Sequence, residues 1–447
     1  MRRWVVRILL VVVMLVLVAG VAGYWYARPL LLTGTGYAAH NACALTHLAD
    51  RPADEDLPPN PLVPYLRVDT SEDGASASVL GVLARQRAWF VDGVGCTLGD
   101  GPPDVGPLTP VEAGEPLPGA ATSPTAVDEL VAEVFGEVFG DDLDDAARDA
   151  LGTRAVVVVH RGEVVAERYA DGFTETTPQL GWSMSKSVAN LLTGTLVLEG
   201  LVEPDDAALR PEWTDERGDI TVDDLMRGTS GLKWDETYDL GTPITRMLYL
   251  EDDMAGYVAG LPLAHTPGNH QQYSSGSTNL LCSVLAERAG GGADLPRRKL
   301  FAPLGLASAV WEVDGAGTPV CSSYLWATPR DWATIGQFVL QDGVWDGERL
   351  LPEGWLRNST TVEPVDSTEE AGYAAGWWVN RDADGAAIDQ RLPVDTVRAL
   401  GHDGQRLYIV PSAELVVVRM GFSPGVGGDE LRTDQLVKEF VAELAGR

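Results

Sequence analysis

GWSMSKS, residues 181–187, leads directly into a run of positions with helical spacing, made up of Val188, Leu191, Leu192, Thr195 and Leu198. Side chains three positions apart are neighbours on a helix, so the Lys186 amine comes within hydrogen-bond reach of the Ser183 hydroxyl. Burial would lower the pKa of this amine and let it accept the hydroxyl proton. The start of the helix also offers backbone N–H groups to an oxyanion. The stretch therefore predicts a nucleophile, Ser183, with Lys186 as its base.

Lysine is scarce in this chain. Of the 33 basic residues other than histidine, only those at positions 186, 233, 299 and 438 are lysines. A guanidinium does not lose its proton in proteins, so a chain that prefers arginine can keep a lysine where a proton must move. Taken alone, however, a Ser-x-x-Lys pattern also fits a helix capped by serine with a solvated lysine.

The composition is that of a globular protein, with 45% hydrophobic residues and 13 tryptophans. The formal net charge is −32. Phosphate binding needs a positive field, so this charge argues against a nucleic-acid partner. The acidity indicates a well-solvated surface, or adaptation to salt, and identifies no substrate.

The N-terminus contains an uncharged apolar stretch, residues 8–26, which as a helix would cross roughly 30 Å of hydrocarbon. Three arginines precede it and one follows closely: Arg2, Arg3, Arg7 and Arg28. By the positive-inside rule we expect a single-pass anchor, residues 1–28, in the cytoplasmic membrane, with the catalytic part outside. The alternative is secretion after cleavage at the small residues 21–23, although the stretch exceeds the roughly 7 to 15 residues of a signal-peptide core.

The four cysteines lie at positions 43, 96, 282 and 321, and none has the spacing of a zinc site. We therefore expect no metal. Disulfides persist outside the cytoplasm, and we expect one between Cys43 and Cys96. Cys282 lies in an apolar helical stretch, and its pairing with Cys321 stays open.

After the anchor, residues 29–124 are interpreted as an extracytoplasmic extension that ends in a Pro/Gly-rich linker from Gly101 to Pro124. One domain, residues 125–447, follows. It begins with an amphipathic helix whose apolar stripe is Val127, Leu130, Val131, Val134, Phe135 and Val138.

Two β-hairpins are predicted at opposite ends of this domain. The first joins residues 155–160 to 164–169, and the second joins residues 407–410 to 415–420. A last amphipathic helix covers residues 436–444, with helical material between the hairpins. One sheet built from both ends of a single domain is therefore expected.

Seven stretches in this order resemble the serine β-lactamase, DD-peptidase and esterase superfamily, in the class C-like branch that includes 6-aminohexanoate-dimer hydrolases. They are SMSKS (183–187), ITVDDLMRGTSGL (220–232), PGNHQQYSS (267–275), LFAPLGL (300–306), SYLWATPRDWATIGQFVL (323–340), GWW (376–378) and GHDGQ (401–405). The resemblance runs from about residue 125 to the end. It implies an α+β, β-lactamase/transpeptidase-like fold: a mostly antiparallel sheet flanked by terminal helices, with an inserted helical subdomain.

By this resemblance Tyr273 matches the tyrosine of the family's Tyr-x-Asn motif, which shares proton transfer with the lysine. The third position of that motif is Ser275 here, and a serine can still hydrogen-bond the lysine or the substrate. His402-Asp403-Gly404 stands where the family has Lys-Thr-Gly, followed by Gln405. The resemblance implies that the N–H groups of Gln405 and Ser183 form the oxyanion hole, and that Gly404 lets substrate approach the backbone.

The implied chemistry is hydrolysis of a small-molecule ester, amide or peptide through an acyl-serine, without a cofactor. His402 in place of lysine removes a permanent cation that would attract a carboxylate, which argues against a dedicated β-lactamase. Two alternatives remain: a D,D-peptidase or β-lactamase, and a catalytically silent, membrane-tethered binding or sensing protein. Trp182, Tyr238, Trp377 and Trp378 could line an acyl pocket, although aromatic residues pack in cores at least as often.

Overall fold

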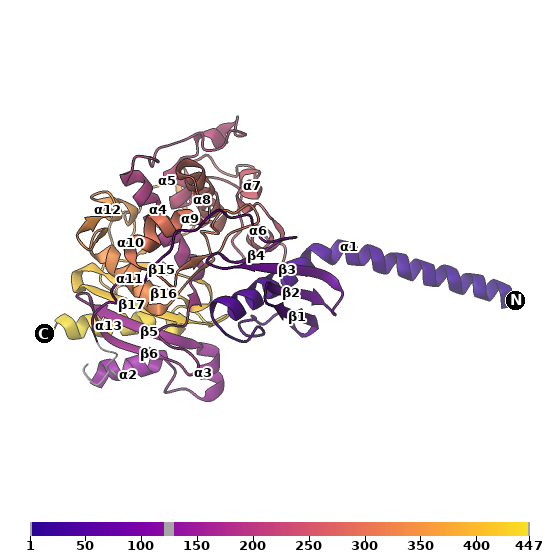
Figure 1. The fold of residues 1–447 in the computed structure, drawn as a ribbon, viewed down its shortest axis with the longest axis horizontal. Helices are drawn as coiled ribbons and strands as arrows, with labels where there is room; N and C mark the ends of the chain where they lie inside the picture. Colours follow the sequence, from indigo (N-terminus) through magenta and orange to yellow (C-terminus); the bar gives the residue numbers. More distant parts are fainter. Residues whose placement is uncertain (1, 120–128, 446–447) are drawn as a thin grey trace.

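The computed structural model describes residues 2–119 and 129–445 (Figure 1). The expected domain start at residue 125 and Val127 of the predicted stripe lie outside these residues. The helix itself is present as α2 (Glu129–Val138).

The centre of the molecule is a six-stranded sheet in the order β14-β15-β16-β17-β5-β6, in which every neighbouring pair is antiparallel. Its strands are β5 (Thr153–His160), β6 (Glu163–Tyr169), β14 (Trp378–Val379), β15 (Val397–Leu400), β16 (Arg406–Val410) and β17 (Leu415–Gly421). Strand β17 from the C-terminal hairpin pairs with β5 from the N-terminal hairpin, so both ends of the domain build one sheet, as predicted.

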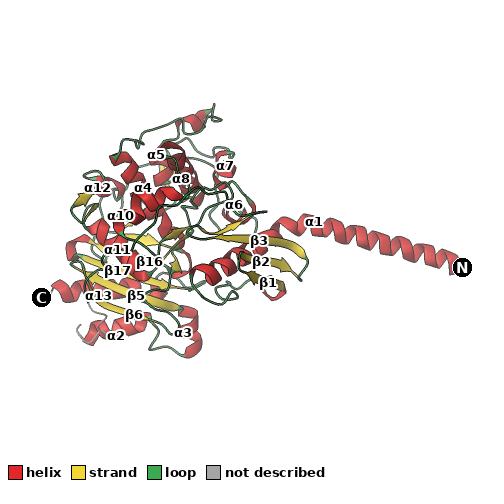
Figure 2. Ribbon diagram, in the orientation of Figure 1, coloured by secondary structure: helices red, strands yellow, loops and turns green. Residues whose placement is uncertain are grey.

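Helices cover both faces of this sheet (Figure 2). On β5, alternate residues point to opposite sides: Val156 and Val158 pack under α2 and α13 (Thr433–Ala445), whereas Val157 and Val159 belong to the core on the other side. Helix α11 (Pro329–Leu340) covers that second side. Its Gly336 lies against the sheet, where an added Cβ would come within 2.5 Å of Val416.

A helical region lies between β6 and β14. Its main helices are α4 (Ser185–Leu198), α5 (Val222–Arg227), α6 (Pro243–Leu250), α7 (Met254–Ala259) and α8 (Ser275–Ala289). The shorter elements of this region are β7 (Gln179–Leu180), β8 (His270–Gln271), α9 (Asp294–Pro296), α10 (Ala302–Leu304), β9 (Val310–Trp311), β10 (Leu325–Ala327), β11 (Val344–Trp345), β12 (Glu348–Arg349), α12 (Trp355–Ser359) and β13 (Ser367–Thr368). Helix α3 (Asp145–Leu151) lies earlier in the chain, directly before β5. A disulfide joins Cys282 on α8 to Cys321, the pairing that the sequence left open.

The N-terminal helix α1 (Arg2–Leu48) is one continuous helix with two different halves. Its first half is apolar and exposed, and projects away from the rest of the molecule (Figure 1). This part is long and apolar enough to cross a membrane or to serve as a signal sequence. The second half is buried against a four-stranded sheet, β1 (Leu66–Ser71), β2 (Gly74–Val79), β3 (Leu83–Val91) and β4 (Gly95–Leu98). The expected disulfide between Cys43 and Cys96 joins this helix to β4.

The extension packs closely on the catalytic part through a buried carboxylate. Glu312 is fully buried and accepts hydrogen bonds from the Cys96 backbone N–H (2.7 Å) and from the Trp326 indole (2.9 Å). Oε2, the oxygen that accepts from Trp326, also lies 3.1 Å from Nε2 of His40, which is buried as well. A carboxylate is costly to bury without partners, so α1 and β4 complete the environment that this residue needs.

The Pro/Gly-rich stretch lacks regular secondary structure, but its described part, residues 101–119, is tied down. The Thr109 N–H donates to Asp294 (2.5 Å), and Arg297 donates to the Thr109 carbonyl (2.9 Å). Further along, the Gly114 N–H donates to the Gly305 carbonyl (3.0 Å). Despite its linker composition, this stretch therefore binds along the catalytic part and is not a free spacer.

Replacing both Cys43 and Cys96 by alanine should lower the free energy of unfolding by about 3 kcal/mol, because the disulfide closes a loop with a sequence separation of 53. Chemical denaturation of the full-length protein measures this loss. An unchanged denaturation midpoint under non-reducing conditions would show that the disulfide adds nothing to the folded state.

Candidate active site

Ser183 lies in a short turn, Trp182–Met184, which runs straight into α4. The backbone of Trp182 has φ +47°, a left-handed conformation that costs a residue with a side chain roughly 1–2 kcal/mol. Such strain persists only where the surroundings fix it. Here Gly181 and Trp182 are buried, whereas Ser183 stays partly exposed. The turn thus presents the Ser183 hydroxyl at the surface of a packed core.

The Lys186 amine is surrounded by oxygen atoms from three parts of the chain. It lies 3.0 Å from the Ser183 hydroxyl, 2.8 Å from the Ser275 hydroxyl and 3.0 Å from the Ser322 carbonyl. The residue is only 2% exposed. Helix α4 has no side-chain cap, so the alternative of a capping serine with a solvated lysine is wrong.

Burial lowers the pKa of Lys186 from its ordinary value to about 8, while the negative charge of Glu236 acts in the opposite direction. About a tenth of the amine is therefore neutral at pH 7, far more than for an ordinary lysine, and a proton acceptor must be in the neutral form.

Tyr273 lies beside the same amine, with its ring centroid 4.6 Å from Nζ of Lys186. Burial raises its pKa well above the ordinary value, the nearby Tyr373 and Glu236 add to this, and the Ser183 hydroxyl acts in the opposite direction. The ring packs against Tyr373 and Trp378, at centroid distances of 5.0 and 5.5 Å. The structure thus brings Ser183, Lys186 and Tyr273 together.

Ser275 connects the lysine to a carboxylate that the sequence analysis missed. Its hydroxyl lies 2.5 Å from Oε1 of Glu236, and its backbone N–H donates to Oε2 (2.9 Å). The indole of Trp234 also donates to Oε2 (2.5 Å). Ser274, the residue before, caps α8 by accepting from the Ser277 N–H (3.0 Å), which fixes the start of the helix. Lys186, Ser275 and Glu236 therefore form a continuous chain of hydrogen bonds.

No local pattern in the sequence singles out Glu236. It is one of 65 acidic residues, and 39 positions separate it from Ser275. The one signal available was its place between Trp234 and Tyr238, which are aromatic residues in an otherwise polar segment. Only the packing of the Glu236 segment against α8 reveals the contact.

The loop with His402, Gly404 and Gln405 is held against the nucleophile turn. An added Cβ on Gly401 would come within 2.3 Å of the Gly181 carbonyl, so the two backbones touch. The Gln405 side chain accepts from the Gly421 N–H (3.0 Å) and donates to the Gly421 carbonyl (2.5 Å). These two bonds form a clamp between the Gln405 side chain and β17.

We expected Gly404 to let the substrate approach the backbone, and the structure shows that packing also requires glycine at this position. Its φ is +90°, and an added Cβ would come within 2.5 Å of the Arg419 guanidinium, which itself donates to the Gly404 carbonyl (2.7 Å). Packing against a fully buried arginine, and the left-handed backbone, therefore account for this residue.

His402 stands at the rim of the site with a side chain that is 39% exposed. Its ring stacks on Tyr238 at 4.5 Å and meets the edge of Trp182 at 5.5 Å. Within residues 2–119 and 129–445, no three His, Cys, Asp or Glu side chains gather in a way that could hold a metal ion.

The antiparallel sheet, the helical region beside it and a buried Ser-x-x-Lys pair between them define the class of serine hydrolases with an active-site lysine. The chain belongs to the beta-lactamase family, whose model, described as Beta-lactamase, matches residues 143–441. The family and the β-lactamase/transpeptidase-like fold predicted from the sequence are confirmed.

Individual proteins agree with this assignment. A 6-aminohexanoate-dimer hydrolase of Paenarthrobacter ureafaciens is 26% identical over 343 residues, which cover 70% of this chain and 84% of that protein. A penicillin-binding protein homolog from Caulobacter crescentus has a TM-score of 0.55 at 18% identity, over 71% of this chain and 98% of its own. A β-lactamase/D-alanine carboxypeptidase from Yersinia pestis has a TM-score of 0.54 at 17% identity, over 70% and 99%. The protein is a hydrolase of this family.

The carboxylate of Glu236 should set the pH range in which Lys186 is neutral. Reactivity of Ser183 toward a fluorophosphonate should rise with pH through about 8 in the wild type as the amine loses its proton. Glu236→Gln removes a charge that favours the ammonium form, so the rise should move to lower pH. The rate of covalent labelling against pH measures the shift.

Asp235→Asn is the matched control, because Asp235 is the exposed neighbour of Glu236 and bonds to Thr237 instead. Its labelling profile should equal that of the wild type. A Glu236→Gln profile that stays in place or moves to higher pH would exclude this electrostatic role.

Proposed function

We propose that this protein hydrolyses an ester or amide through a covalent intermediate on Ser183, outside the cytoplasmic membrane. The observation that carries the proposal is the buried Lys186 amine, 3.0 Å from the Ser183 hydroxyl, with a pKa lowered to about 8. A serine hydroxyl is a weak nucleophile until a base takes its proton, and this amine is placed to do so.

In the proposed reaction Ser183 attacks the substrate carbonyl and Lys186 takes its proton. The negative oxygen of the tetrahedral intermediate would be held by the backbone N–H groups of Ser183 and Gln405. The clamp between Gln405 and Gly421 supports this role, because an oxyanion donor must be fixed before the reaction.

Tyr273 and Lys186 then deliver the proton to the leaving group, which departs as an alcohol or amine. Water attacks the acyl-serine in the second half of the reaction and releases the acid. Ser275 and Glu236 keep the amine in place between the two steps. The name of the Paenarthrobacter relative, a hydrolase of a 6-aminohexanoate dimer, supports an amide as one possible substrate.

The location of the reaction follows from the N-terminus. Residues 1–28 would anchor the protein in the membrane, and the arginines before the apolar stretch favour an N-terminus in the cytoplasm. Residues 125–447 would form the hydrolase domain and residues 29–124 the extension, of which the described part, residues 29–119, packs on the hydrolase domain. The two disulfides support an oxidising compartment.

Intact-mass spectrometry after exposure to a fluorophosphonate tests the proposal. The wild type should gain one covalent label, and Ser183→Ala should gain none, because the activated hydroxyl is gone. Ser187→Ala is the control, since Ser187 is on the same helix but donates to the Gly376 carbonyl. A folded wild type that stays unlabelled would favour a silent, membrane-tethered binding protein, and labelling by a penicillin would favour a cell-wall enzyme.

A further inference from the structure

A cleft of about 260 Å³ lies where the N-terminal extension meets the catalytic part. The extension supplies one wall from the segment that contains Leu57, Pro58, Leu62, Val63 and Leu66. This wall lies outside residues 143–441, the part that matches the family.

The catalytic side of the cleft includes residues that contact the turn of the nucleophile. Tyr238 and His402 line it, and both rings contact Trp182, the residue before Ser183. Tyr37 of α1 lines the cleft as well and stacks on the same Trp182 at 6.4 Å. Helix α1 therefore reaches the shell of side chains that surrounds the nucleophile turn.

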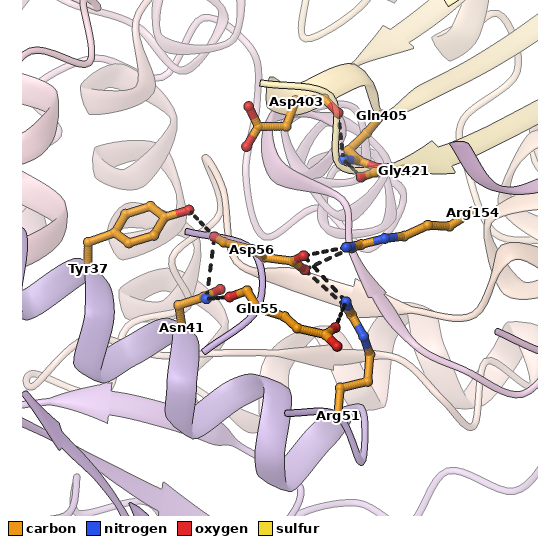
Figure 3. A network of polar contacts seen from close by, with 9 residues as sticks. All are labelled: Tyr37, Asn41, Arg51, Glu55, Asp56, Arg154, Asp403, Gln405 and Gly421. Carbon is orange, nitrogen blue, oxygen red and sulfur yellow. Dashed lines mark hydrogen bonds and ion pairs between the residues drawn. The ribbon is translucent and has the colours of Figure 1, made fainter. Parts of the chain in front are cut away.

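The extension holds its wall in a fixed position (Figure 3). The Tyr37 hydroxyl donates to the Asp56 carbonyl (3.1 Å), and Asn41 donates to the Glu55 carbonyl (2.9 Å). The Asp56 carboxylate is bound by Arg51 (2.9 Å) and by Arg154 of the central sheet (2.8 Å). The segment that follows Asp56 thus begins from a point tied to both parts of the protein.

Close packing at α1 also shapes the cleft. An added Cβ on Gly34 would come within 3.0 Å of the Leu62 side chain, and one on Gly36 within 2.9 Å of Tyr249. Both neighbours line the cleft. Helix α1 therefore lines the cleft between the wall from the extension and the wall from the catalytic part.

The proton donor and the cleft are formed by different side chains. Tyr273, which would protonate the leaving group, packs against Tyr373 and Trp378, and none of these three lines the cleft. The leaving group must lie near its proton donor. The acyl part of a bound substrate would then extend away from these three rings, toward His402, Tyr238 and the leucine and proline side chains of the extension.

We propose that this cleft binds a linear acyl chain, so that the N-terminal extension gives the enzyme its preference for medium- to long-chain acyl substrates. This inference rests on the proposed acyl-serine chemistry. It also fits the position of the cleft: Gly34 follows Tyr26, the end of the apolar stretch, by eight residues of continuous helix, or about 12 Å. Amphiphilic esters that gather at a membrane surface would reach such a site directly.

The test compares kcat/KM for p-nitrophenyl octanoate and p-nitrophenyl acetate, with the full-length protein in lipid nanodiscs. The wild type should favour the octanoate at least tenfold. Leu62→Trp fills the cleft and should abolish this preference while changing kcat/KM for the acetate less than threefold. Tyr65→Trp is the matched control, because Tyr65 is exposed on the same segment and does not line the cleft.

Leu240→Trp fills the same cleft from the catalytic side and is used in place of Leu62→Trp if Leu62→Trp does not fold. A wild type without chain-length preference would overturn the inference. The inference would also be overturned if the cleft-filling variant kept the preference for the octanoate, or if it lost activity on the octanoate and the acetate equally. If the wild type neither hydrolyses the acetate nor reacts with a fluorophosphonate, the proposed hydrolase function itself fails, which is a distinguishable result.

Discussion

The site depends on keeping one amine, that of Lys186, buried and hydrogen-bonded. An ammonium group away from water is unfavourable unless oxygen atoms surround it, and here they come from the turn before α4, from the start of α8 and from the Ser322 backbone. Two contacts fix the position of the Ser322 backbone relative to α8. The disulfide between Cys282 and Cys321 joins α8 to the residue before Ser322, and the Asn279 side chain accepts from the Ser322 N–H (2.9 Å).

The N-terminal extension is structurally part of the enzyme. Glu312 lies in the catalytic part, yet two of its three partners, Cys96 and His40, come from the extension. Asp56 of the extension bonds Arg154 on the central sheet, and Tyr37 touches the residue before the nucleophile. The helix α1 is therefore exposed and apolar in its first half and packs among the side chains around the active site in its second half.

Local patterns predicted what depends on neighbours in the sequence. The spacing of Ser183 and Lys186 predicted their contact, and β-rich runs on either side of short turns predicted the hairpins of the central sheet. The structure places Tyr273 beside Lys186, as the family resemblance implied. The bond between Lys186 and Ser275 joins residues 89 positions apart, and Glu236 is placed by packing against α8. No local sequence pattern could therefore predict the chain of hydrogen bonds from Lys186 through Ser275 to Glu236. The stretch from Gly101 to Pro124 has the composition of a linker, so the sequence predicts an extension, residues 29–124, that is separate from the hydrolase domain. Only the contacts of residues 29–119 show that the extension is tied to the catalytic part.

The most direct test of the account is a titration of Lys186 itself. With four lysines in the whole chain, NMR of protein labelled with ¹³C at the lysine ε-carbons should give four resolvable signals. We expect one of them to titrate near pH 8 and to be absent in Lys186→Met. If no signal titrates near pH 8, the Lys186 amine is not prepared to accept the Ser183 proton, and the proposed mechanism is contradicted.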